Sequence, residues 1–378
     1  MKASAAPSLA APGIFPPASE PRFLSIQVLR AVAAIGVIYQ HLQYDFSIKF
    51  GVAGFPPALG VSDLGVDLFF VISGFIMVYT SESLYGRAGG WKTFMTRRVI
   101  RIVPIYWLTT LAALAYILVR QRASDLEPAS IFYPWIAASF LFVPFPRTSG
   151  DVVPLNGVGW TLNYEMFFYA IFVVALLLPR RFAVGAVSLL FAALAVVGIA
   201  FTPLPNPLAY WCDTIILEFV FGMLIAAALR EGFTLPRWAG ALCVLAGLAA
   251  HVWVGLVGGG GLPRFIIWGL PGAFIVAGLA ATARPAVCVR RPRLLTRLFV
   301  FLGDASYSIY LVHPFMVAAP RLILFGLAGD GVTVPPHPWL YAGTQFAAAI
   351  AVGVMVHLAF ERPVTRYLRR RYERRAAS

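Results

Sequence analysis

Two side chains that could perform chemistry share one apolar segment near the start of the chain. Residues 25–43 are hydrophobic enough to cross a bilayer, yet they contain Arg30 and His41. On a helix their 11-residue separation makes three turns plus about 20°, so both side chains leave one face, about 16 Å apart along the axis. A charged residue at the centre of a membrane helix costs about 2.5–3.5 kcal/mol, so the pair is a candidate functional site. Arg30 alone could be an interfacial anchor and His41 a packed residue, but their shared face favours a function.

Five later blocks of sequence also combine polar residues with apolar surroundings. They are GVDLFFVISGF (65–75), RRVIRIVPIYW (97–107), WTLNYEMFFY (160–169), FVFGMLIA (219–226) and SYSIYLVHPF (306–315). Together with Arg30 and His41, and in this order over nearly the whole chain, these blocks make the sequence resemble acyltransferase family 3. Members of that family are membrane proteins that transfer acyl groups from acyl-CoA to sugar hydroxyls. The resemblance is closest to the stand-alone branch that acts on exopolysaccharides.

The resemblance implies an enzyme, an integral membrane O-acyltransferase. Its expected donor is cytoplasmic acyl-CoA, with acetyl-CoA as the first choice. Its expected acceptor is a hydroxyl of a lipid-linked or secreted sugar that belongs to exopolysaccharide or to the cell surface. Membrane lipids are the other expected partners. A transporter or flippase of a lipid-linked sugar is the competing interpretation, and an inactive acyltransferase-like scaffold in an export assembly is a third.

The composition is that of a polytopic α-helical membrane protein. Hydrophobic residues make up 60% of the 378 positions and charged residues 12%, against about 25% charged residues in soluble domains. Many apolar runs reach 18 residues, and the alternating ten-residue segments of a β-barrel do not occur. The net charge of +14 comes from basic residues in short loops, so it indicates membrane topology rather than nucleic-acid binding. Cys212, Cys243 and Cys288 lie in or beside different segments, so neither a disulfide framework nor a metal site is predicted.

Loop charge decides which apolar segments cross the membrane. Candidates lie near residues 25–43, 64–81, 102–119, 131–145, 157–178, 183–201, 210–229, 238–257, 264–282, 304–325 and 339–360. If 131–145 does not cross, the Arg-rich loops fall on the cytoplasmic side, whereas its crossing would invert every later loop. That segment is short and contains Pro134 and Pro144, so we interpret it as re-entrant or interfacial. We therefore predict an all-α bundle of about ten spans in the inner (plasma) membrane, with both termini cytoplasmic.

Composition also divides the chain into three parts. Residues 1–22 are rich in Ala, Pro and Ser, and we predict a disordered cytoplasmic tail. Residues 23–361 form the predicted transmembrane acyltransferase domain. Residues 362–378 form a basic cytoplasmic tail, whose arginines we expect to face anionic lipid.

On this topology a histidine and two carboxylates gather near the outer surface. His41 lies toward the outer end of the first span, and Asp67 and Glu165 open later spans from the same side. An imidazole titrates near neutral pH and can take the proton of a sugar hydroxyl. His41 is therefore the predicted general base, with Glu165 or Asp67 as its orienting partner. Asp67 could instead cap its helix, and Glu165 could make a structural hydrogen bond.

Arginines gather at the opposite, cytoplasmic end. Arg97, Arg98 and Arg101 precede the third apolar segment, and Arg98 and Arg101 share a face if the helix already runs there. Paired guanidinium groups suit the phosphates of coenzyme A, and Arg30 would extend this cationic track inward. Contacts with lipid phosphates are the alternative role for the same arginines.

A channel must join these two ends if acyl-CoA is to reach His41. Its predicted lining on the segment 304–325 consists of Ser306, Tyr307, Tyr310 and His313. Mixed polar packing is the alternative role for these side chains.

The transfer chemistry needs donors to the oxyanion that forms when a hydroxyl attacks the thioester. Trp160, Asn163 and Tyr164 are the candidates. Transfer could be direct, or it could pass through an acyl-enzyme on His41 or on a serine such as Ser73. The sequence leaves both routes open.

Overall fold

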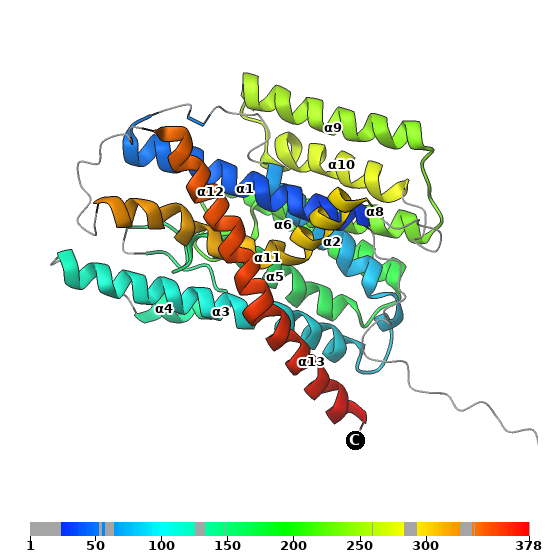
Figure 1. The fold of residues 1–378 in the computed structure, drawn as a ribbon. Helices are drawn as coiled ribbons and strands as arrows, with labels where there is room; N and C mark the ends of the chain where they lie inside the picture. Colours follow the sequence, from blue (N-terminus) through cyan, green and yellow to red (C-terminus); the bar gives the residue numbers. More distant parts are fainter. Residues whose placement is uncertain are drawn as a thin grey trace, which may run out of the picture.

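The computed structural model describes residues 24–52, 55–56, 64–124, 133–147, 149–258, 260–282, 293–325, 335 and 337–377. Within these ranges the regular secondary structure is helical, and the long helices pack side by side as a bundle (Figure 1). Eight of the described helices are long and apolar enough to cross a membrane, and two shorter apolar helices cover Leu64–Thr80 and Phe265–Ala281. The predicted all-α bundle is therefore confirmed for the described part of the chain. The predicted tail 1–22 lies outside the described residues.

Five helices carry the polar residues discussed below. They are α1 (Leu24–Phe50), α2 (Leu64–Thr80), α3 (Gly90–Ser124), α5 (Trp160–Ala175) and α11 (Leu294–Phe325). The other long helices are α6 (Arg180–Ala200), α8 (Leu217–Arg230), α9 (Arg237–Val257), α10 (Leu270–Ala281) and α12 (Pro338–Val356). Short helices α4 (Tyr133–Phe140) and α7 (Leu208–Trp211) separate longer ones, and α13 (Arg362–Ala377) follows α12. Two π-helical turns, Phe265–Gly269 and His357–Glu361, precede α10 and α13.

Helix α4 occupies most of the described part of the segment 131–145. Its 8 residues span about 12 Å, whereas a bilayer core is about 30 Å thick, so α4 cannot cross on its own. It packs on α3, where the Tyr106 hydroxyl donates to the Ser139 carbonyl (2.8 Å) and the Trp107 indole to the Phe140 carbonyl (3.0 Å). This arrangement agrees with a segment that does not cross the membrane.

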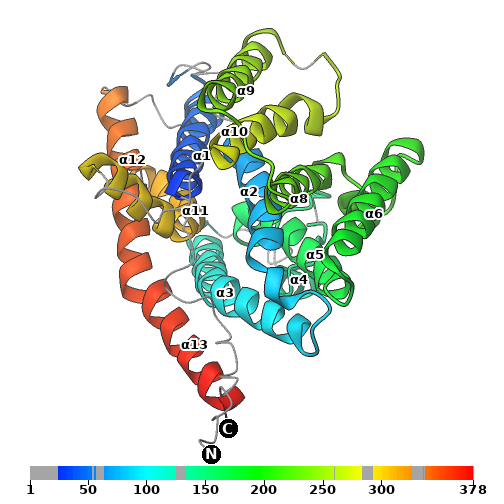
Figure 2. The same ribbon diagram turned by 90° about the vertical axis from the view of Figure 1, so that its right-hand side faces the viewer.

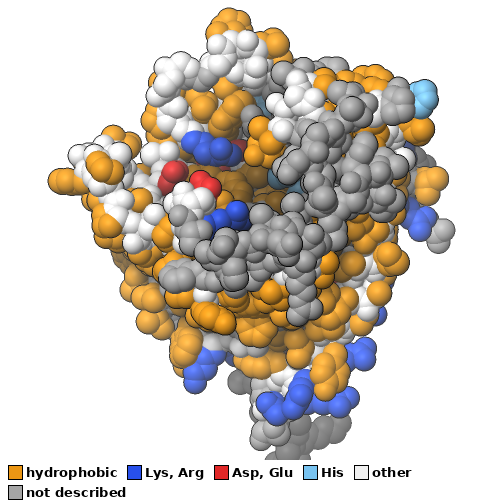
Figure 3. Space-filling view, turned by 90° about the vertical axis from the view of Figure 1, so that its left-hand side faces the viewer, with side chains coloured by type: hydrophobic (Ala, Val, Ile, Leu, Met, Phe, Trp, Pro, Cys, Tyr) orange, Lys and Arg blue, Asp and Glu red, His pale blue; other side chains and the backbone are white. Residues whose placement is uncertain are grey.

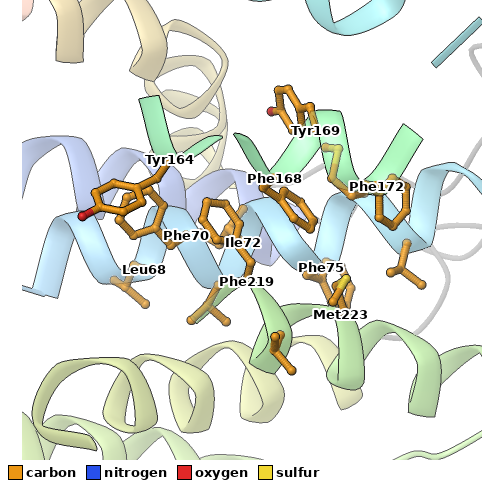
Figure 4. Close-up of a cluster of buried hydrophobic side chains, with 14 of the residues drawn as sticks. Leu68, Phe70, Ile72, Phe75, Tyr164, Phe168, Tyr169, Phe172, Phe219 and Met223 are labelled. Carbon is orange, nitrogen blue, oxygen red and sulfur yellow. The ribbon is translucent and has the colours of Figure 1, made fainter. Parts of the chain in front are cut away.

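The central contact of the bundle is between α2 and α8. A Cβ atom added at Gly222 would lie 1.9 Å from the Val71 carbonyl oxygen, and one at Gly74 would lie 2.0 Å from the Phe219 carbonyl oxygen. Small residues permit such backbone contact, which matters in a membrane because apolar side chains gain little by leaving lipid. Aromatic rings of α2, α5 and α8 fill the space beside this contact, and Phe168 stacks on Phe219 at 4.5 Å (Figure 4).

Helices α1 and α11 form a second close pair. Arg30 contacts Ser306, and His41 contacts His313, so residue numbers rise in the same direction along both helices. The two helices therefore run parallel, and an odd number of membrane crossings must lie between them. Gly303 lets them approach, because a Cβ atom there would lie 2.0 Å from the Gln27 carbonyl oxygen.

Helix α13 extends beyond the bundle as a continuation of the line of α12 (Figure 2). It begins at Arg362, where the sequence places the start of the basic tail. Seven of its residues are arginines: Arg362, Arg366, Arg369, Arg370, Arg371, Arg374 and Arg375.

The glycine contact predicts a large effect of a single methyl group. Gly222→Ala should lower the thermal midpoint of the purified protein in detergent, because overpacking of this kind typically costs about 1–3 kcal/mol. Gly185→Ala is the matched control, since nothing lies within 4 Å of a Cβ atom there. Equal midpoints for the two variants would contradict the proposed tightness of the α2–α8 contact.

Candidate active site

A cavity of about 770 Å³, counting the part open to solvent, lies between α1, α2, α3, α5 and α11. Hydrophobic side chains of α2 form much of its wall. Its polar lining consists of Arg30, Ser73, Arg98, Arg101, Thr161, Glu165, Tyr169, Ser306, Tyr307 and Tyr310.

Three arginines face this cavity from α1 and α3. Arg30 is buried and donates to the Ser306 hydroxyl (3.0 Å), which in turn donates to the Gly303 carbonyl (2.8 Å). Arg98 is also buried, and its guanidinium lies over the ring of Tyr169 at 5.9 Å. Arg98 and Arg101 lie three residues apart on one helix and line the same wall, as their spacing predicts. Arg97 is not among the residues that line this cavity.

Glu165 is the carboxylate of this cavity. It accepts hydrogen bonds from the Ser73 hydroxyl (3.0 Å) and from the Tyr169 hydroxyl. Its negative charge also attracts Arg30 and Arg98. The structure therefore gives Glu165 partners on α2 and α5 instead of His41, for which the sequence suggested it as an orienting carboxylate.

Asp67, the other suggested orienting carboxylate, forms an ion pair with Arg264 at 2.9 Å. Arg264 also lies 4.0 Å from Glu218, and both acidic side chains are fully buried while Arg264 is 35% exposed. This three-residue group joins α2, α8 and the turn before α10. Arg264 is the sequence signal for it, because it is a lone arginine beside outer loops that are otherwise poor in basic residues.

A second carboxylate group that sequence reasoning missed lies where α12 ends. The Glu361 carboxylate accepts from the Ser308 hydroxyl (2.6 Å) and from His357 Nδ1 (2.7 Å), and all three side chains are buried. Glu361 attracts Arg30 and adds negative charge near the cationic wall of the cavity. A single acidic residue at the end of a long apolar segment is the signal that could have identified it.

The two imidazoles of the site lie beside each other. The rings of His41 and His313 are 4.6 Å apart at an interplanar angle of 74°. His41 Nδ1 lies 3.0 Å from the Val37 carbonyl oxygen, and His313 Nδ1 lies 2.6 Å from that of Tyr310. Tyr310 links this pair to the cavity, because its ring lies 5.8 Å from that of His313 and also lines the cavity wall.

The remaining predicted channel residues are divided between the cavity and the surrounding packing. Tyr307 lines the cavity and donates to the Ile102 carbonyl (3.2 Å). Trp160, Asn163 and Tyr164 are not among the lining residues. Tyr164 stacks on Tyr210 at 4.0 Å, and Asn163 is buried with an Oδ1 atom that no described group satisfies.

The end of the bundle at which α1 ends and α12 begins is hollowed. Figure 3 shows this face, with mainly hydrophobic side chains in the depth of the hollow and acidic and basic side chains at its rim. His41 lies closer to this end of α1 than Arg30 does, by about 16 Å of helix. The arrangement therefore has an arginine-rich end and a histidine end.

The described residues contain no group of three or more His, Cys, Asp or Glu side chains that could hold a metal ion. Cys212 and Cys243 are free thiols, and Cys288 lies outside the described residues.

Comparison with known proteins places these features in a family. The model of the acyltransferase 3 family, described as an acyltransferase domain, matches residues 23–358. Exopolysaccharide production protein ExoZ of Rhizobium meliloti (strain 1021) is 35% identical over 307 residues, which cover 80% of this chain and 89% of ExoZ. Acyltransferase MdmB of Streptomyces mycarofaciens is 26% identical over 387 residues, with 93% of each chain covered.

A putative O-acetyltransferase of Staphylococcus aureus (strain COL) is 26% identical over 318 residues, which cover 75% of this chain and 49% of that protein. No solved structure matches the chain. The family match covers nearly the whole sequence, and the ordered blocks that begin with Arg30 and His41 lie within it. The chain therefore belongs to acyltransferase family 3, in a branch similar to the exopolysaccharide protein ExoZ.

Proposed function

We propose that this protein is an inner-membrane O-acyltransferase that moves an acetyl group from cytoplasmic acetyl-CoA to a hydroxyl of an exopolysaccharide sugar. The observation that carries the proposal is the cavity itself, which has arginines in one wall and reaches Tyr310, the neighbour of the histidine pair, at another. Family membership and the similarity to ExoZ support acyl transfer and a polysaccharide acceptor.

The donor is proposed to enter at the arginine-rich end. Arg98 and Arg101 would bind the phosphates of acyl-CoA through charge-assisted hydrogen bonds, with Arg97 at the mouth outside the lined part. The pantetheine arm would then follow Arg30, Ser306 and the apolar wall. A slender thioester chain suits a cavity whose wall is largely hydrophobic.

The reaction is proposed to take place at the histidine end. His41 removes the proton of the acceptor hydroxyl while the hydroxyl oxygen attacks the thioester carbonyl. Tyr310 lines the cavity, whereas Trp160, Asn163 and Tyr164 do not, but its hydroxyl donates to the Val158 carbonyl (3.0 Å) and would have to exchange that bond to stabilise the oxyanion. Ser73 also lines the cavity and bonds Glu165, so the acyl-enzyme route retains a structural basis beside direct transfer.

The topology proposed is ten spans with cytoplasmic termini. The parallel α1–α11 pair supports it, because α2, α3, α5, α6, α8, α9 and α10 would supply seven crossings between them, an odd number as required. The eight residues of α4 support the exclusion of 131–145 from the count. In this topology the arginine end of the cavity faces the cytoplasm and the hollow of Figure 3 faces outward.

Transport of a lipid-linked sugar is the second candidate function. It shares the membrane bundle but gives no reason for a cavity with arginines in one wall and Tyr310, the neighbour of the histidine pair, in another. Purified protein distinguishes the two functions, because only an acyltransferase should release free coenzyme A from acetyl-CoA when a sugar acceptor is added.

His41→Ala should abolish this release while the protein still inserts and folds. A general base typically contributes about 10²–10⁴-fold to the rate, so kcat should fall at least about a hundredfold. The measurement is thiol release from acetyl-CoA by detergent-purified protein with alkali-deacylated exopolysaccharide as acceptor. A well-folded His41→Ala protein with the activity of the wild type would refute the assignment of the base.

Arg98→Ala and Arg101→Ala should each raise the KM for acetyl-CoA more than they lower kcat. A hydrogen bond to a charged group is typically worth about 1.5–3 kcal/mol, and its loss corresponds to an increase in KM of about ten- to a hundredfold. Arg181→Ala is the control, because Arg181 lies at the start of α6, is exposed and is not part of the cavity lining. If the Arg98 and Arg101 variants change only protein abundance, these arginines are membrane anchors.

A further inference from the structure

His313 on α11 is a buried imidazole with one unused nitrogen. Its side chain is 0% exposed, and its Nδ1 lies 2.6 Å from the Tyr310 carbonyl oxygen. A carbonyl can only accept, so the proton of the neutral ring is on Nδ1 and Nε2 keeps its lone pair. No described group bonds that Nε2 atom.

A buried acceptor atom without a hydrogen bond, such as His313 Nε2, needs an explanation. It typically costs about 1–3 kcal/mol, and the Nδ1 bond to the Tyr310 carbonyl does not use this second nitrogen. Buried groups of this kind in folded proteins are often catalytic or bind an unseen partner. Nε2 is therefore the atom of His313 that is available to a proton.

His41 is the ring beside it. The same hydrogen-bond argument applies, because His41 Nδ1 lies 3.0 Å from the Val37 carbonyl oxygen. Both rings thus keep Nδ1 protonated and leave Nε2 able to accept a proton. Their ring centres lie 4.6 Å apart, so the two imidazoles are in direct contact.

The two rings do not have equivalent surroundings. His41 is half-buried and lies nearer to the hollowed end of the bundle. His313 is fully buried, and its other aromatic neighbour is Tyr310, which lines the donor cavity. His41 is therefore on the acceptor side of the pair and His313 is on the donor side.

We propose that His41 and His313 form a two-histidine proton relay, a role that rests on the proposed acyltransferase function. The acceptor oxygen attacks the thioester carbonyl carbon, and the hydroxyl proton moves to His41 Nε2. The carbon–sulfur bond breaks as the carbon–oxygen bond of the ester is completed. His41 passes the proton to His313 Nε2, and His313 gives it to the departing thiolate.

This series of reaction steps balances without a further reactant. The acceptor loses one proton and gains the acyl group, and coenzyme A leaves as the thiol. Both imidazoles return to their starting state, with the proton on Nδ1. In this arrangement His41 is oriented by the Val37 carbonyl, and the second imidazole lies beside it.

His313→Phe tests the relay, because it keeps a planar ring in the same space but cannot carry a proton. We expect kcat for acetyl transfer to fall at least about a hundredfold, with the KM for acetyl-CoA within about threefold of the wild type. The thermal midpoint is measured beside kcat, because phenylalanine also lacks the Nδ1–H that bonds the Tyr310 carbonyl. His313→Gln should show the same loss of kcat, since an amide keeps polarity but does not accept the proton.

His251→Phe is the matched control. His251 is also 0% exposed, neither of its ring nitrogens has a hydrogen-bond partner among the described groups, and it packs against Trp268 at 4.7 Å outside the cavity lining. Removal of this imidazole should leave kcat and the KM for acetyl-CoA unchanged.

The assay uses full-length protein in detergent, acetyl-CoA and exopolysaccharide deacylated with mild alkali. If His313→Phe keeps kcat within about threefold of the wild type, ring packing is sufficient and the relay is wrong. A rise in donor KM equal to the fall in kcat for both His313 variants would assign His313 a structural role and would also overturn the relay. If the wild type itself releases no thiol, the acyltransferase function fails, which is a different outcome from an active His313→Phe variant.

Discussion

Charge buried inside an apolar bundle is the constraint on which the rest of this structure depends. An ionised group away from water is costly unless hydrogen bonds or opposite charges compensate it. Arg30 bonds Ser306 across two helices, Asp67 pairs with Arg264, and Glu165 accepts two hydroxyl groups. Apart from the bond from Tyr169 to Glu165 within α5, these contacts join different helices or distant parts of the chain, so the charges also determine how the helices are placed against one another.

Close helix packing makes those contacts possible. The hydrophobic effect does little to hold helices together in lipid, and association depends on backbone proximity and on polar bonds. Gly303 brings α11 against α1 within one turn of Ser306, the partner of Arg30. The same parallel pair brings His313 to His41 further along. Packing and polar contacts are therefore two aspects of one interface.

The cavity follows from the five helices that meet around it. Guanidinium groups from α1 and α3 form one wall, and hydroxyl groups from α2, α5 and α11 form others. Glu165 lies among them and balances part of the positive charge. An anionic donor that enters such a cavity would exchange one set of charge contacts for another. A transferred acyl group would meet mainly apolar wall and hydroxyl groups.

The sequence by itself determined what depends on local geometry and composition. Length, hydropathy and loop charge identified a helical membrane protein, and the ordered blocks identified its family. The placement of Arg98 and Arg101 on one wall followed from a three-residue spacing on a single helix. The arrangement of arginines at one end and a histidine at the other could also be predicted, because it depends on spacing within single helices.

The tertiary structure alone decided which side chains meet across helices. Asp67 and Arg264 are 197 positions apart, and Ser73 and Glu165 are 92 apart, so no local period relates them. The sequence offered Asp67 and Glu165 to His41 because the predicted topology put all three toward one end of the membrane, but depth does not specify the rotation of a helix about its axis. That rotation follows from glycine contacts and buried polar bonds between segments distant in the chain, and it places His313 beside His41.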